Sequence, residues 1–329
     1  MKNNIIEVEK LKKTFETSIK KKGEFRKTKF DFVAVDNISF SITEGEIIGF
    51  IGPNGAGKST TIKILTGILH PTSGKASVAS YTPWKNRIEM SYKIATMFGQ
   101  KSSLLPHLKV MDSYYLLGAI YDIKKDVLEE RINEITEFFD IKHLMSKRSR
   151  ELSLGQRMIC EIASAVLHRP DIIFLDEPTI GLDIVVKKKV RDLIFMLNKK
   201  YNTTIFITSH DISDIEELCS RIILINHGKI MIDEKMSEIK EHYLTRKVVS
   251  AYISKEASED AILGVFQDKF FNVSFEKGFV EIEFDTSTKK VHEVIHMLST
   301  ITEIYDLRVG GTSLENVIYD VYTNKKEGL

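Results

Sequence analysis

The fold of this chain is decided by one stretch, Gly52-Pro53-Asn54-Gly55-Ala56-Gly57-Lys58-Ser59. It has the spacing G-x-x-x-x-G-K-[ST], in which glycines let the backbone turn its N–H groups toward phosphate oxygens. An apolar run, Ile47–Ile51, precedes it, and a helical pattern begins at about Lys58. The stretch therefore predicts a P-loop: Lys58 should reach the β- and γ-phosphates of a nucleotide, and the Ser59 hydroxyl should bind Mg²⁺. We assign the phosphate site to this loop and to Thr60, which follows it.

A second apolar run ends in two acids. Residues 172–175, Ile-Ile-Phe-Leu, are typical of a buried strand, and Asp176 and Glu177 follow at once. A carboxylate here can hold the Mg²⁺ shell, and the next one can polarise an attacking water. Alone, two acids after a strand are more often a solvated strand end. Beside the P-loop, they predict a metal ligand in Asp176 and a catalytic base in Glu177.

Outward from these motifs, short β-branched runs alternate with helical patterns. Continuous apolar runs at 47–51, 172–175, 204–208 and 222–225 indicate strands covered on both faces of a parallel sheet. A stretch at about 105–155 has helical patterns instead, and we interpret it as an inserted helical subdomain. The fold class predicted for about residues 1–240 is therefore an α/β P-loop NTPase core.

The pattern changes near residue 240. Strands are expected at 247–253, 273–275, 280–284 and 304–309, and helices at 259–266, 291–298 and 314–321. The order β-α-β-β-α-β plus a helix predicts a small α+β domain of ferredoxin-like arrangement over 241–329.

Further motifs carry a resemblance to a known family. Leu152-Ser153-Leu154-Gly155-Gln156-Arg157 resembles the LSGGQ signature of ATP-binding cassette (ABC) ATPases. Gln100 resembles their Q-loop glutamine, residues 177–183 their catalytic glutamate and D-loop, and His210 their switch histidine. The resemblance covers about residues 5–235. The D-loop, the residues after the signature, a basic insertion and the C-terminal tail are similar to those of bacterial drug and sodium export ATPases with separate permease chains.

The resemblance implies a mechanism and its residues. Two chains, expected to be identical, would close head to tail around two ATP molecules, so that signature residues of one chain cap the γ-phosphate held by Lys58 of the other. Glu177, His210 and Gln100 would be catalytic, and Ser59, Gln100 and Asp176 would bind Mg²⁺. The nucleotide site would also include Ser153, Gly155, Gln156 and Asp183. Leu154 departs from the signature by replacing its first glycine, but it is not one of the phosphate-binding residues.

The adenine-stacking aromatic is open. Phe15 stands where the family places it, while Phe25, Phe30 and Phe32 compete because a basic segment, 19–30, lies close by. We interpret that segment as a loop. It is either a solvated insertion or a contact with anionic lipid or a partner subunit.

Composition restricts the partners. Across 329 residues, 47 Lys and Arg against 46 Asp and Glu give no reason to expect nucleic acid. Two cysteines suit a reducing cytosol, and we expect neither a signal peptide nor a membrane-spanning helix. The expected place is therefore the cytoplasmic face of the membrane, through permease subunits that select the substrate.

Two rival readings remain. His292-Glu293-Val294-Ile295-His296 matches the zinc-protease pattern H-E-x-x-H, although the apolar stripe of this helix leaves both histidines toward solvent. An ABC ATPase with a regulatory or signalling role, serving no transporter, is the other alternative.

Overall fold

The structure, a computed structural model, describes residues 3–19, 28–98, 102–209, 211–242, 246–311 and 314–323. The chain divides into two compact units, residues 1–234 and 235–329.

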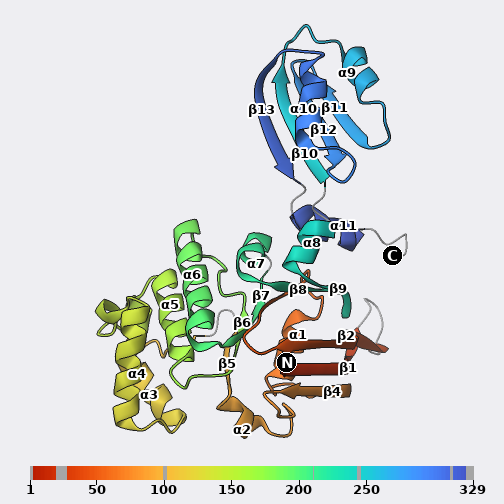
Figure 1. Cartoon of the computed structure of the whole chain (residues 1–329). Helices are drawn as coiled ribbons and strands as arrows, with labels where there is room; N and C mark the ends of the chain where they lie inside the picture. Colours follow the sequence, from red (N-terminus) through yellow and green to blue (C-terminus); the bar gives the residue numbers. More distant parts are fainter. Residues whose placement is uncertain are drawn as a thin grey trace. The chain divides into compact units, whose positions relative to one another are not determined.

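The first unit is built on a six-stranded sheet of order β5-β6-β7-β3-β8-β9 (Figure 1). Its strands are β3 (Ile47–Ile51), β5 (Ile94–Phe98), β6 (Ile172–Asp176), β7 (Thr204–Thr208), β8 (Arg221–Asn226) and β9 (Lys229–Lys235). Strands β5, β6, β7, β3 and β8 are parallel, and β3 and β7 are buried throughout. This confirms the predicted α/β core. Because parallel strands place their carboxyl ends at one edge, the residues after β3, β6 and β7 come together there.

A three-stranded antiparallel sheet of order β2-β1-β4 packs into the same core, with β1 (Asn4–Ile19), β2 (Thr28–Thr43) and β4 (Ser73–Val78). Strands β1 and β2 pair along their whole length, up to Ile19 opposite Thr28. Our interpretation of 19–30 as a loop is therefore wrong at both ends, which are strand. In sequence, the many Lys and Thr residues at the end of a long hairpin resemble those of an inserted loop. Residues 20–27 lie outside the described residues.

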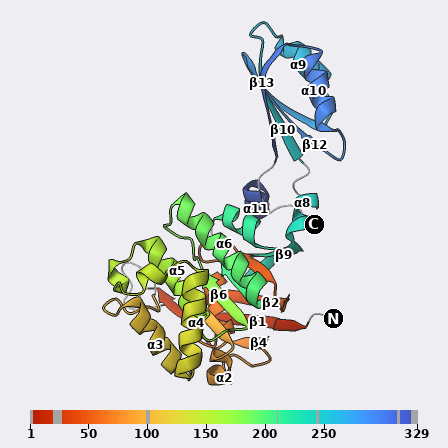
Figure 2. The same cartoon turned by 60° about the vertical axis from the view of Figure 1, so that its left-hand side comes forward.

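Helices complete the unit. They are α1 (Lys58–Leu65), α2 (Arg87–Ser91), α3 (Val110–Ile120), α4 (Lys125–Phe138), α5 (Leu154–Ala165), α6 (Ile184–Tyr201) and α7 (Ile212–Leu218), with short 3₁₀ turns at Lys142–Leu144 and Ser149–Glu151. Helices α3, α4 and α5 lie together on one side of the sheet in both views (Figures 1 and 2). Tyr114 of α3 is fully buried and donates its hydroxyl to the Cys160 carbonyl of α5, 2.8 Å away. Strands are absent from the described part of 105–155, as predicted.

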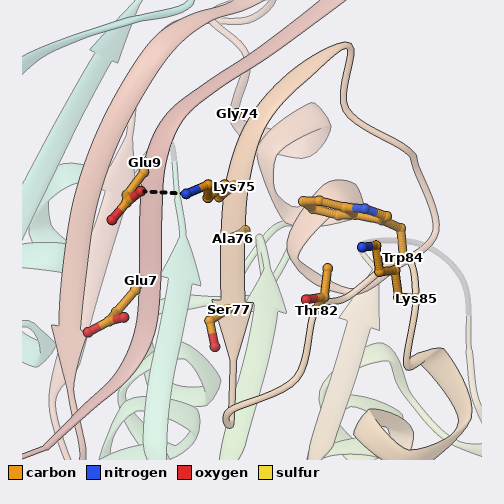
Figure 3. A pocket seen from close by; sticks show the side chains of 9 residues that line it. All are labelled: Glu7, Glu9, Gly74, Lys75, Ala76, Ser77, Thr82, Trp84 and Lys85. Carbon is orange, nitrogen blue, oxygen red and sulfur yellow. Dashed lines mark ion pairs between the residues drawn. The ribbon is translucent and has the colours of Figure 1, made fainter.

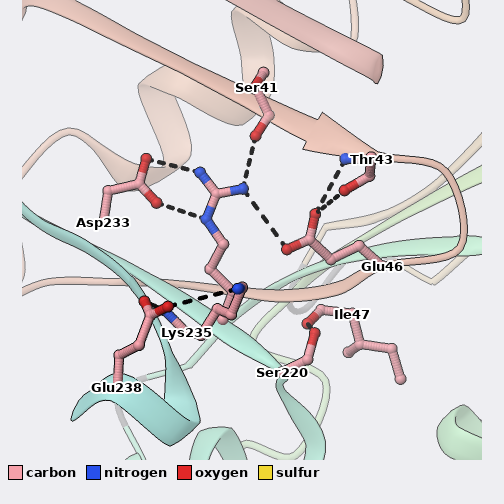
Figure 4. A network of polar contacts seen from close by, with 9 residues as sticks. Ser41, Thr43, Glu46, Ile47, Ser220, Asp233, Lys235 and Glu238 are labelled. Carbon is pink, nitrogen blue, oxygen red and sulfur yellow. Dashed lines mark hydrogen bonds and ion pairs between the residues drawn. The ribbon is translucent and has the colours of Figure 1, made fainter. Parts of the chain in front are cut away.

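One guanidinium joins the two sheets of this unit. Arg221 of β8 makes a two-armed ion pair with Asp233 of β9, at 2.6 and 2.8 Å (Figure 4). It also donates to the Ser41 carbonyl of β2 at 2.9 Å and lies 3.6 Å from Glu46. Glu46 in turn accepts from the backbone N–H of Thr43, at 3.0 Å. These bonds hold the turn that leads into β3, and hence the entry to the P-loop.

The second unit contains a four-stranded sheet of order β11-β12-β10-β13. The chain order is α8 (Met236–His242), β10 (Arg246–Ile253), α9 (Glu259–Val265), β11 (Phe271–Glu276), β12 (Phe279–Asp285), α10 (Val291–Ser299), β13 (Ile304–Gly311) and α11 (Leu314–Thr323). Alternate residues of β10 and β12 are buried with Ile262, Val294 and Leu298 of the helices. The β-α-β-β-α-β order and antiparallel pairing agree with the predicted ferredoxin-like fold.

Candidate active site

The P-loop occupies the turn between β3 and α1, and its glycines are there for steric reasons. Gly57 has φ 113°, and a Cβ on it would lie 2.5 Å from the Ala34 carbonyl oxygen. A Cβ on Gly52 would lie 2.3 Å from the Ile225 carbonyl oxygen. Only glycine fits both positions, so the backbone passes close to β2 and β8 and opens its other side to solvent.

The pocket beside the loop is lined by ten residues. They are Phe32, Ala34, Pro53, Asn54, Gly55, Gly57, Lys58, Ser59, Thr60 and Glu177. The structure thus brings most of the predicted P-loop together with Glu177. Gly52 and Ala56 do not line the pocket; Ala56 is buried and helps to shape the loop.

Lys58 joins the loop to the two acids. Its ammonium donates to the carbonyl oxygens of Gly52 and Pro53. Burial lowers the pKa of Lys58, while the charges of Glu177 and Asp176 act in the opposite direction. The negative charges of both carboxylates therefore contribute to the electrostatic environment of this ammonium. The Ser59 hydroxyl and the Asp176 carboxylate are hard oxygen donors of the kind that Mg²⁺ prefers.

Thr208, at the end of β7, holds the two acids. Its hydroxyl donates to Asp176 Oδ1 at 2.6 Å, and its carbonyl accepts from the Glu177 N–H at 3.0 Å. Glu177 has φ 55°, a left-handed conformation that costs a non-glycine residue about 1–2 kcal/mol. The strand end therefore holds this carboxylate in the pocket against its local preference. Sequence reasoning missed Thr208, whose signal was only its position at the end of an apolar run.

The aromatic wall of the pocket is Phe32, with 47% of its surface exposed. Phe15 lies directly opposite Phe32 in the β1–β2 pair, so the two rings share a face of the sheet. Phe15 is half-buried, does not line the pocket, and has the Lys13 ammonium 5.1 Å from its ring centroid. Of the two, only Phe32 lines the pocket beside the P-loop.

Phe32→Ala is expected to weaken ATP binding by about 5- to 150-fold, because a base stacked on an aromatic ring contributes about 1–3 kcal/mol. Phe15→Ala, the matched control from the opposite strand, should change the affinity for ATP by no more than about twofold. Titration calorimetry with ATP distinguishes them. Weakened binding in Phe15→Ala alone would return the stacking role to Phe15.

The signature and the D-loop form a second cluster. Ser153 caps α5: its Oγ accepts from the Gln156 N–H at 3.2 Å, and Gln156 Oε1 accepts from the Ser153 N–H at 3.1 Å. The Ser153 O–H proton remains available to a phosphate oxygen. A Cβ on Gly155 would lie 2.5 Å from the Val186 side chain of α6. Asp183 caps the same helix, because its carboxylate accepts from the Val186 N–H at 2.9 Å. Within the described residues, the P-loop pocket has no lining residue from 152–157.

Gln100 and His210 lie outside the described residues, so their predicted roles stay predictions. The segment after His210 is nevertheless tied to the D-loop. Asp214 of α7 is fully buried, accepts from the Thr179 hydroxyl at 2.5 Å and pairs with Arg191 of α6 at 2.8 Å. This buried pair, which no sequence motif indicated, fixes the loop after Glu177 against α7.

Arg191→Ala is expected to destabilise the chain by about 3–5 kcal/mol, because it leaves the Asp214 carboxylate buried without its cation. Glu217→Ala removes the other partner of Arg191, at 2.9 Å, but Glu217 is 60% exposed. The expected cost there is at most about 1 kcal/mol. Urea unfolding of the two variants measures the difference, and equal midpoints would show that the buried pair contributes little.

Other features offer less chemistry. A hollow of about 540 Å³ lies beside β4, and its lining includes two glutamates of β1 and two lysines: Glu7, Glu9, Lys75 and Lys85 (Figure 3). Lys75 lies 3.9 Å from Glu9, so charges of both signs meet there, and nothing selects an anionic nucleotide. Both cysteines are buried, and burial raises the pKa of the Cys160 thiol to about 12.

The histidines of the H-E-x-x-H pattern are both exposed on α10. Across the described ranges, no group of three or more His, Cys, Asp or Glu side chains is placed to hold a metal ion. No helix in the same ranges has both the length and the apolar character that crossing a bilayer demands.

Known proteins resemble this chain over two thirds or more of its length. Residues 35–180 match the ABC transporter family. The bacitracin transport ATP-binding protein BcrA of Bacillus licheniformis is 32% identical over 240 residues, which cover 73% of this chain and 75% of BcrA. The ABC transporter ATP-binding protein NatA of Bacillus subtilis is 29% identical over 222 residues, which cover 68% of this chain and 90% of NatA. Among solved structures, the ATP-binding cassette MJ0796, a post-hydrolysis dimer bound to ADP and Pi, is 27% identical, with a TM-score of 0.59 over 70% of this chain and 98% of that one.

Proposed function

Since this chain belongs to the ABC transporter ATP-binding proteins and is an ATPase of that family, we propose that two copies close head to tail around two Mg²⁺–ATP molecules and drive a separate membrane permease in the export direction. The P-loop pocket would hold the nucleotide, with Phe32 on the adenine. Ser59 and Asp176 would hold the metal ion, which would neutralise charge on the phosphates.

One observation supports the shared site above the others. Ser153 is exposed, yet it does not line the pocket that Lys58 and Glu177 share. A γ-phosphate in that pocket can be capped by Ser153 only if a second chain presents it. Exposed apolar side chains surround the signature and D-loop, as a contact with another chain requires: Leu154, Ile180, Ile184 and Val185.

In this arrangement Glu177 is the base that polarises the attacking water, and Lys58 stabilises charge on the phosphates. Thr208 orients both acids through its two bonds. Closure of the pair excludes water from the pocket, and hydrolysis of ATP allows the two chains to separate again. Alternation between the two states would move the permease. The similarity to proteins named for bacitracin transport and for multidrug transport favours export of a drug-like substrate.

The permease is tested by co-purification. The tagged chain, isolated from gently solubilised membranes of the cell that makes it, should carry a polytopic membrane protein with it. Lys58→Ala should retain this partner, because the change lies in the nucleotide pocket. Recovery without any membrane protein would favour the second candidate, a regulatory ABC ATPase that serves no transporter.

A further inference from the structure

Strand β13 (Ile304–Gly311) is an open edge of the sheet in the second unit. It pairs with β10 on one side and has no strand on the other side among the described residues (Figures 1 and 2). It carries exposed apolar side chains, Tyr305 at 64% and Val309 at 45%. A long edge with exposed apolar residues is a template for pairing with another strand.

The backbone of β13 has groups to offer such a strand. The Leu307 N–H donates to Asp306 Oδ1, 2.8 Å away, within its own strand. It is therefore directed away from β10, since the groups that face β10 belong to a ladder. Along an antiparallel strand, the backbone N–H and C=O groups of successive residues point to opposite sides. The backbone groups of Val309 therefore point outward, like those of Leu307, while the backbone groups of Asp306 and Arg308 point toward β10.

The side chains of β13 are complementary to themselves. Around Leu307 the sequence reads Tyr305, Asp306, Leu307, Arg308, Val309. Antiparallel pairing of two copies centred on Leu307 places Asp306 opposite Arg308 and Tyr305 opposite Val309, in both directions. Pairing centred on Asp306 or Arg308 would instead place like charges opposite each other, which is unfavourable.

We propose that β13 pairs with β13 of a second copy of this chain, about a two-fold axis through Leu307, without any need for ATP. The register uses the outward backbone groups of Leu307 and makes Asp306–Arg308 a non-hydrogen-bonded pair, in which the side chains are closest. The two four-stranded sheets become one continuous sheet.

This contact goes beyond the ATP-dependent closure proposed above, because it involves neither the P-loop nor the signature. It keeps the two cassettes of an assembly at high effective concentration between turnovers. Closure on ATP then becomes a step within one assembly.

Charge reversal tests the register in the full chain without nucleotide. Sedimentation should show a dimer. Asp306→Arg and Arg308→Asp should each weaken association at least ~10-fold, because each change creates two like-charge pairs across the axis. The double variant Asp306→Arg/Arg308→Asp should restore association to within about threefold of the original. Glu276→Arg, on the opposite edge strand β11, is the matched control and should leave association unchanged.

Disulfide trapping tests the axis independently. The natural cysteines are buried, so an introduced thiol reports alone. Leu307→Cys should cross-link readily, because paired Cα atoms lie about 5.5 Å apart. Tyr305→Cys should not, because two copies of residue 305 would be about 14 Å apart along the strand. A monomer at high concentration, a double variant as weak as its parents, or equal cross-linking at both positions would each overturn the proposal. None of these measurements depends on ATP, so a failure here is separate from a failure of the shared nucleotide site.

Discussion

Glu177→Gln is expected to slow ATP hydrolysis at least ~10²-fold while ATP binding is unchanged, the effect of losing a general base. The carboxylate lines the pocket with Lys58, and Thr208 and the left-handed backbone hold it there. Glutamine keeps the shape and the backbone bond but cannot take a proton. The loss should therefore appear in kcat.

Phosphate release from the chain with its permease measures the rate, and calorimetry measures ATP binding. Glu44→Gln, an exposed glutamate before β3, is the control and should behave as the original chain does. Turnover within a few-fold of the original in Glu177→Gln would remove this residue from the chemical step.

Lys58→Ala and Ser153→Arg are each expected to abolish most ATPase activity, and mixing the two variants is expected to restore part of it. Lys58 lines the pocket and Ser153 does not, so in the proposed head-to-tail pair each functional site takes one residue from each chain. A mixed dimer has one site in which an intact Lys58 faces an intact Ser153. Rescue will be modest if both sites must act together.

Association gives a cleaner measurement of the same shared site. In an Arg308→Asp background, which removes the proposed β13 contact, ATP should convert Glu177→Gln from monomer to dimer. Adding Ser153→Arg should prevent this, because a bulky cation then occupies the phosphate cap. A Glu177→Gln chain that binds ATP and never associates would contradict head-to-tail closure; if the partner is a different cassette subunit, that subunit must be present.

The core could be predicted from sequence because its signals are local. The strand before the P-loop is continuously apolar, and the glycines of the loop are required by backbone approaches that almost no other residue permits. The alternation of β10 and β12 in the second unit likewise follows from burial of one face.

Tertiary register could not be predicted in this way. Strand β1 has register shifts between Val8 and Leu11 and again before Thr14. Each shift changes which side chains meet across the hairpin, so sequence position alone could not place Phe15 or Phe32 in the pocket. The Arg191–Asp214 pair could not be predicted for a similar reason. In sequence, charged residues on two helices indicate solvent-exposed faces, and only the packing of the helices shows that these two are buried together.

The left-handed backbone at Glu177 implies that folding stability and ATPase activity favour different residues at this position. Asparagine tolerates that conformation better than glutamate does, so Glu177→Asn should gain up to about 1 kcal/mol of folding stability. It would also be inactive, because the amide is no base and the side chain is shorter. A library screened only for heat resistance should therefore accumulate asparagine at this position and lose the enzyme, whereas a screen that demands ATP hydrolysis should return glutamate.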